Sequence, residues 1–196
     1  MALINTRLNN AGFTLIELLV VVTISTIMIG VAVPYYSSYI KAGSSNASFN
    51  QMLRVVQLAR STAINEGTFV SVCPTTQNIA AAPSSINCES AGEYFIAFRD
   101  LNQDGVLNTE DTEGTGSINE AVVRFINFNG QGQSETNERR DQAITFQPDG
   151  GTYQTADAGS VYFCSNDLEE QIQQSVVVSL TGRARIGDKL NANACT

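Results

Sequence analysis

The fold of this chain is decided by the stretch FTLIELLVVVTISTIMIGVAV, which runs from Phe13 to Val33 and is followed by Pro34. As an α-helix this stretch would be about 31 Å long, which matches the roughly 30 Å hydrocarbon core of a bilayer. Its only charged residue is Glu17, near its start. Because a carboxylate in a membrane-spanning helix is costly, we take Glu17 as a functional residue.

Two simpler interpretations of the apolar stretch are a secretory signal peptide and a plain membrane anchor. A signal peptide has an apolar region of about 7–15 residues and a small-residue cleavage site after it. Here the apolar stretch is longer, and the small residues Ala11 and Gly12 stand before it. A plain anchor stays open, but it does not account for Glu17.

The segment from Gly12 to Glu17, GFTLIE, together with the apolar run and Pro34, resembles the N-terminus of type IV pilins. In that family a prepilin peptidase cuts after the glycine and methylates the new N-terminal residue, here Phe13. The resemblance implies that residues 1–12 are a leader peptide and that the mature chain begins with a methylphenylalanine. It also implies a single-pass protein of the inner membrane, with its head in the periplasm before assembly.

The same resemblance gives Phe13, Glu17 and Pro34 roles in filament assembly. The α-amino cation of Phe13 and the carboxylate of Glu17 in a neighbouring subunit are each costly alone in lipid. Their pairing would favour assembly and fix the axial register of the subunits. Pro34 removes one helical hydrogen bond, so we expect a kink at the membrane boundary.

Beyond Pro34 the sequence predicts that the helix continues. The segment 43–46, Gly-Ser-Ser-Asn, is a weak point where the helix could melt locally. Apolar residues then recur at intervals of 3, 4, 3 and 4, which places them on one helical face. They are Phe49, Met52, Val56, Ala59 and Ala63. With Gly67 as a C-terminal cap, we expect one helix over about 13–66, in which 13–33 is the membrane half and the remainder packs on a domain.

After Gly67 the apolar period changes to two, which is typical of short strands separated by polar loops. Strands are predicted at 68–73, 93–99, 121–128, 143–147, 160–164 and 175–180, with an extension over 183–186. The predicted fold class is therefore α+β. A long N-terminal helix packs on an antiparallel β-sheet or small β-sandwich, the head, over residues 67–196.

The second half of the chain resembles one branch of the pilin family, the GspH/FimT/FimU group. The resemblance is carried by Ala59-Arg60-Ser61 with Ala63-Ile64, by Phe98-x-Asp100 with Asn102, and by VVSLTGRAR at 177–185. It implies a minor pilin or pseudopilin whose partners are other minor and major pilins. Three functions stay open: a minor pilin at or near the tip of a type IV pilus that helps initiate assembly, a minor pilin that is also a DNA receptor, and a GspH-like pseudopilin of a type II secretion system. The final location would be an extracellular pilus or a periplasmic pseudopilus.

The composition argues against an enzyme. The 196 residues include no histidine, which excludes Ser-His-Asp and Cys-His catalysis and every histidine-ligated metal site. With the cysteines expected to be oxidised, no recognisable pair of nucleophile and base is left. We therefore expect no enzymatic activity and no small-molecule substrate.

The four cysteines, Cys73, Cys88, Cys164 and Cys195, suit an exported, oxidised domain. They allow three pairings, of which we favour Cys73–Cys88 and Cys164–Cys195. The first pair flanks a polar loop, and the second would tie down a C-terminal tail. Metal binding by four thiolates is the alternative, but the sequence lacks C-x-x-C spacing.

The stretch DLNQDGVLNTED, from 100 to 111, fits a calcium-binding loop. Oxygen donors stand at its positions 1, 3, 5, 9 and 12, a glycine at position 6, and a backbone carbonyl is available at position 7. The predicted ligands are Asp100, Asn102, Asp104, Val106, Asn108 and Asp111. The alternative is a solvated turn rich in Asx residues and glycine that follows a strand. Calcium is thus the one cofactor that the sequence suggests.

Gly182, Arg183 and Arg185, with Lys189, form the one dense basic cluster of the sequence. Alternate residues of a strand face the same way, so Arg183 and Arg185 would project together and could contact successive phosphates. In FimT-like members of the group, a Gly-Arg-x-Arg motif near the C-terminus is associated with DNA binding during natural transformation, and Gly182 would let the backbone pass close to phosphates. Alternatively, the arginines pair with the acidic body or with a neighbouring subunit. The net charge of −8 opposes the approach of DNA.

Overall fold

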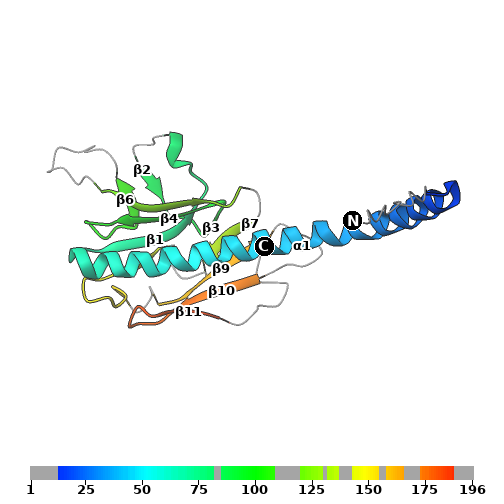
Figure 1. The fold of residues 1–196 in the computed structure, drawn as a ribbon. Coiled ribbons are helices and arrows are strands. Elements are labelled where there is room, and N and C mark those ends of the chain that lie inside the picture. The colour runs from blue at the N-terminus through cyan, green and yellow to red at the C-terminus, as the bar shows by residue number, and fades with distance from the viewer. Residues whose placement is uncertain are drawn as a thin grey trace, which may run out of the picture. The chain divides into compact units, whose positions relative to one another are not determined.

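The computed structural model of the protein describes residues 13–81, 85–108, 120–129, 132–136, 143–154, 158–165 and 173–187. The chain forms two compact units, Met1–Ile40 and Lys41–Thr196. The division falls inside one helix, α1 (Leu15–Glu66), so the second half of α1 belongs to the larger unit, which we call the head unit. Figure 1 shows the strands of the head unit alongside that half of the helix.

The first half of α1 is an exposed apolar helix. The segment Leu15–Ala32 has a mean hydropathy of 2.4, and none of it is buried. By length and composition it is long and apolar enough to cross a membrane. The helix α1 continues through Pro34 to Glu66. The predicted kink at Pro34 stays a prediction.

The second half of α1 packs on the head unit as the apolar spacing predicts. All five residues of the predicted stripe are buried, and Val55 joins them. Gly67 has a φ of 65°, and the N–H of Thr68 donates to the carbonyl of Ala63 over 3.2 Å. This is the bond of a Schellman cap, so the predicted C-terminal stop at Gly67 is confirmed.

The segment 43–46 is helical and not melted. Its side chains contact the ends of two strands of the head unit: the hydroxyls of Ser45 and Ser165 lie 2.9 Å apart, and Gln174 donates to Asn46 over 3.2 Å. Ser45 is buried. The low helix propensity of the segment is why sequence alone suggested a weak point. In the structure these polar contacts compensate for that low propensity.

Two antiparallel sheets and one short ribbon make up the β-structure of the described residues. The four-stranded sheet has the order β6-β4-β1-β8, and the five-stranded sheet has the order β11-β10-β9-β7-β3. Their strands are β1 (Val70–Thr75), β4 (Tyr94–Arg99), β6 (Val122–Asn127) and β8 (Ile144–Phe146), then β3 (Ala91–Gly92), β7 (Gly132–Thr136), β9 (Ser160–Ser165), β10 (Gln173–Val178) and β11 (Ala184–Ile186). The ribbon pairs β2 (Ser85–Asn87) with β5 (Val106–Asn108), and a 3₁₀ turn, η1 (Ile79–Ala81), precedes it.

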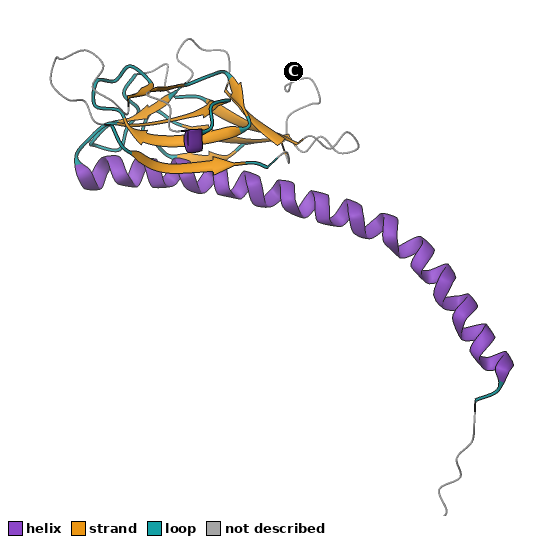
Figure 2. Cartoon of the chain, turned by 90° about the horizontal axis from the view of Figure 1, so that it is seen from above, coloured by secondary structure: helices purple, strands orange, loops and turns teal. Residues whose placement is uncertain are grey.

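The head unit has two hydrophobic clusters. The larger one lies between α1 and the inner faces of both sheets, so the helix covers them together (Figure 2). The smaller one lies on the other face of the four-stranded sheet, beneath the β2–β5 ribbon. Both clusters consist of residues from Phe49 onward, so the fragment 41–196 contains the whole core. Burial on both faces explains why every residue of β1 is buried.

The predicted α+β fold is confirmed. Each of the six predicted strands overlaps a strand of the structure: β1, β4, β6, β8, β9 and β10. The predicted extension over 183–186 is a separate strand, β11, which pairs antiparallel with β10. Sequence reasoning missed β2, β3, β5, β7 and η1. The first three of these strands are only two or three residues long, too short to show a period.

Two side chains of α1 fix the C-terminal part of the helix to the sheets. Glu66 pairs with Arg99 of β4 through two hydrogen bonds of 2.6 and 2.9 Å. One turn and a half earlier, the Arg60 Nε donates to the carbonyl of Gly150 over 2.8 Å, and its Nη2 donates to that of Thr181 over 3.1 Å. Arg60 therefore holds together two turns whose bonded residues, Gly150 and Thr181, lie 31 residues apart in the sequence.

Gly182 belongs to this arrangement. It is buried, has a φ of 70°, and a Cβ at this position would collide with the carbonyl oxygen of Gly150 and lie 3.0 Å from the Arg60 Nε. Only glycine fits both the conformation and the space. The sequence motifs around Arg60 and Gly182 thus meet in the structure as one packing contact.

We therefore expect Gly182→Ala to lower the free energy of unfolding of the 41–196 fragment by about 2 kcal/mol or more, from positive-φ strain and the collision with Gly150. Arg60→Ala should cost about 1–2 kcal/mol, because two carbonyls lose a charged donor. Urea denaturation measures both. The control is Arg54→Ala on the same helix, whose Nε bonds only to the carbonyl of Asn50 and which should change stability by less than about 0.5 kcal/mol. Equal effects at Arg54 and Arg60 would contradict this role of Arg60.

Candidate functional sites

The first site is the N-terminal end of α1. Phe13 is 82% exposed, and Thr14 caps the helix, because its hydroxyl accepts the N–H of Glu17 over 3.3 Å. Thr14 and Glu17 thus stand at the positions of a capping box, a signal that the sequence analysis did not use. Gly12 and the rest of the predicted leader lie outside the described residues.

Glu17 lies on the surface of this helix. Within the described part of the chain its side chain has no ion-pair partner, and its surroundings are apolar. In lipid such a carboxylate requires a cation or a proton. Among the described residues, the positive end of the helix dipole is the positive potential next to Glu17.

The second feature is the disulfide framework. The predicted pairing of Cys73 with Cys88 is confirmed, and it links the end of β1 to the ribbon that covers the smaller cluster. Cys164 is also disulfide-bonded. Its predicted partner, Cys195, lies outside the described residues, so this second pairing stays a prediction.

The third feature is the acidic loop after β4. Asp100 is fully buried and accepts hydrogen bonds from the Ser71 hydroxyl and from the N–H groups of Asp104 and Gly105, over 2.6, 3.2 and 3.1 Å. Asp104 in turn accepts the N–H of Val106 over 2.7 Å. These carboxylates therefore organise the loop backbone.

Glu120 also binds the backbone of this loop, although it lies after the loop in the sequence. It is buried and accepts the N–H groups of Leu101 and Asn108, over 2.8 Å each. Burial raises the pKa of Asp100, and burial likewise raises the pKa of Glu120. Sequence reasoning missed Glu120 because it belongs to no periodic segment and lies nine residues after Asp111 in the chain.

The calcium site stays a prediction. The described residues contain no group of three acidic, cysteine or histidine side chains that could hold a metal ion. Asn102 and Asn108 direct their amide groups at Asp104, over 2.6 and 3.4 Å. Asp111, the predicted twelfth ligand, lies outside the described residues.

The two buried carboxyls predict a pH dependence of stability. Their pKa values are raised on folding, so the folded state binds more protons than the unfolded state between the unfolded and the folded pKa. The stabilisation of the folded state by these two carboxyls is therefore complete below about pH 4, near their unfolded pKa values. It is lost as the pH rises through their folded pKa values. Melting of the 41–196 fragment should shift upward from pH 7 to pH 5. In Asp100→Asn with Glu120→Gln this shift should shrink, and an unchanged pH slope would contradict the assignment.

The fourth feature is the predicted basic cluster. Arg183 and Arg185 are exposed, while Ala184 between them packs against the core. Arg185 lies opposite Val177 on β10, and β11 forms the outer edge of the five-stranded sheet. The structure gives Gly182 a different role from the predicted one, because it is buried against Gly150 and Arg60. Lys189 lies outside the described residues.

Two protein-family models match this chain. Residues 48–182 match the family model described as type II transport protein GspH, and residues 7–33 match the prokaryotic N-terminal methylation motif. No curated protein sequence matches the chain. A solved structure, the type IV minor pilin FimU of Pseudomonas aeruginosa, is 13% identical, with a TM-score of 0.48 over 76% of this chain and 92% of that chain.

A second solved structure is the minor pseudopilin EpsH from the type 2 secretion system of Vibrio cholerae. It is 12% identical, with a TM-score of 0.42 over 73% of this chain and 95% of that chain. The family match covers more than half of the chain, and the methylation motif coincides with the start of the exposed apolar helix. This chain therefore belongs to the GspH family of pilin-like proteins.

Proposed function

We propose that this protein is a minor pilin, assembled at or near the tip of a type IV pilus, where it helps initiate pilus assembly. The observation that carries the proposal is the apolar helix Leu15–Ala32, which is wholly exposed and begins at a methylation motif. Such a surface needs lipid before assembly and other apolar helices after it. A pseudopilin of a type II secretion system, the alternative, would have the same features.

The proposed mechanism begins in the inner membrane, with the head in the periplasm. A prepilin peptidase removes residues 1–12 and methylates Phe13. The amine of Phe13 and the carboxylate of Glu17 in a neighbouring subunit then neutralise each other. Because each charge is costly alone in an apolar medium, the pair favours entry into the filament and sets the register there. Other minor and major pilins are the partners, and the protein performs no catalysis.

Glu17→Ala tests this mechanism. The variant should reach the membrane and be cleaved normally, because residues 7–13 are untouched. Its amount in sheared filaments should fall at least tenfold relative to the membrane pool, because the Phe13 amine loses its partner. Quantitative immunoblots of both fractions make the measurement.

The control for Glu17→Ala is Glu93→Ala, which removes an exposed carboxylate from the head and should enter filaments normally. Wild-type levels of Glu17→Ala in filaments would contradict the pairing. Deletion of the gene, scored for pilus extension and for protein secretion, separates the pilus from the type II secretion system.

A second candidate function is DNA binding through Arg183 and Arg185, which is favoured by their joint exposure beside an inward-facing Ala184. Together with Lys189 they would neutralise about three phosphates, which gives a log–log salt slope of roughly −2 to −3 on duplex DNA. Because the chain is acidic, one site should bind weakly and without sequence preference.

The test is a mobility-shift titration of Arg183→Gln with Arg185→Gln at low and moderate salt. The double variant should lose binding and still fold. Arg54→Gln with Arg124→Gln removes the same charge elsewhere and should bind DNA like the wild type. If both pairs bind equally, or if the wild type shows no shift at low salt, Arg183 and Arg185 are not a DNA site.

A further inference from the structure

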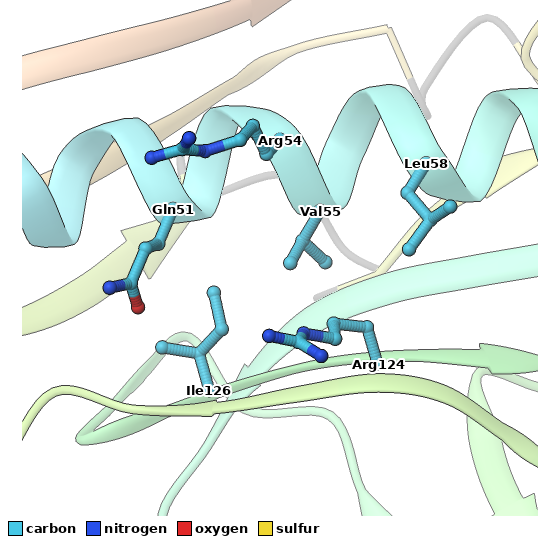
Figure 3. A pocket seen from close by; sticks show the side chains of 6 residues that line it. All are labelled: Gln51, Arg54, Val55, Leu58, Arg124 and Ile126. Carbon is cyan, nitrogen blue, oxygen red and sulfur yellow. The ribbon is translucent and has the colours of Figure 1, made fainter.

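A groove of about 560 Å³ lies between α1 and β6 in the head unit. Figure 3 shows the side chains of both elements facing each other across it. Its lining residues are Gln51, Arg54, Val55 and Leu58 of α1 with Arg124 and Ile126 of β6.

The floor of the groove is apolar. Val55 and Ile126 are 3% and 6% exposed, whereas Leu58 remains 41% exposed. The four helical residues of the groove are spaced by 3, 1 and 3 positions, so they lie along one side of α1. They form a second stripe, next to the stripe from Phe49 to Ala63 that packs in the core. Of the two apolar side chains in this stripe, Val55 is buried in the core, and Leu58 is the one that the described part of the head unit leaves partly uncovered above the groove floor.

Two arginines flank this floor, one from each wall. Arg54 is directed by a hydrogen bond of 3.2 Å from its Nε to the carbonyl of Asn50, and Arg124 extends from β6 toward Val55 (Figure 3). Neither has an ion-pair partner among the described residues. The chain carries 19 acidic and 11 basic side chains, so two unpaired arginines at one groove stand out against the prevailing charge. Their charge is complementary to carboxylates.

The wall formed by β6 is also an open sheet edge. β6 is the outermost strand of the four-stranded sheet and pairs only with β4 within the described residues. Its register shifts at Ala97 and Phe98, which leaves Val123 without an opposite residue. An edge strand presents backbone N–H and C=O groups that an extended peptide can pair with.

We propose that this groove binds an extended, acidic segment of another filament subunit, which adds a strand to β6. Every second side chain of such a segment would point into the groove, on the face of β6 that carries both Arg124 and Ile126. Among these inward-facing side chains, an apolar one would cover Leu58 above the apolar floor, while carboxylates would pair with Arg54 and Arg124. A nucleic acid would use the arginines but neither the apolar floor nor the strand edge. The identity of the partner as a pilin rests on the proposed function, whereas the binding chemistry does not.

The probe is a fluorescein-labelled peptide, blocked at both ends, in which every second residue alternates between valine and glutamate with threonine between them, so that one face of the strand carries both side-chain types. The readout is fluorescence anisotropy with the full chain in detergent. The wild type should bind it saturably. Arg54→Gln with Arg124→Gln should weaken binding at least tenfold, and Leu58→Ser should weaken it measurably. Arg183→Gln with Arg185→Gln is the matched control, because it removes two exposed arginines elsewhere; its dissociation constant should stay within twofold of the wild type. Circular dichroism confirms that each variant is folded.

Three results would overturn the proposal. The first is no binding by the wild type. The second is equal weakening by both arginine pairs, which would indicate unspecific attraction to an acidic peptide. The third is a thymidine oligonucleotide that binds through Arg54 and Arg124 while the peptide does not, which would make the groove a nucleic-acid site. Because Glu17→Ala leaves the groove intact, failure of filament entry and failure of peptide binding are separate outcomes.

Discussion

The exposure of the apolar helix Leu15–Ala32 is the constraint on which the rest of this protein depends. Burial of one large aliphatic side chain is worth about 1.5–3 kcal/mol, and here an 18-residue segment offers none of its surface to its own chain. The helix therefore has to be covered by lipid or by other subunits. Under the proposed function, the carboxylate of Glu17 favours those neighbouring subunits that bring a positive charge to the same depth.

The head unit is built on the continuation of the same helix. Beyond residue 41, α1 changes from exposure to burial on one face, and both sheets close over that face. Arg60 and Gly182 then join two distant turns to the helix, and Glu66 with Arg99 fixes its end. The groove beside α1, around Arg54 and Leu58, is the surface that we propose for a partner.

Sequence alone predicts the elements whose pattern is periodic and long. The stripe from Phe49 to Ala63 and six strands were predictable because burial on one face imposes a period. The cap at Gly67 was predictable because glycine is favoured after the last turn of a helix. Short pieces such as β3 carry no period, and Glu120 acts through backbone N–H groups that only the folded loop brings together. Gly182 was singled out for a close approach of its backbone to phosphates, whereas in the structure it packs against Gly150, which lies 32 residues away in the sequence and could not be inferred.

The most direct test of this account is mass spectrometry of purified, sheared filaments. The account predicts that these filaments contain the chain at low stoichiometry, that its N-terminal residue is methylated Phe13, and that residues 1–12 are absent. A chain that stays in the membrane with residues 1–12 attached, and that is missing from filaments in a strain with active prepilin peptidase, would contradict it.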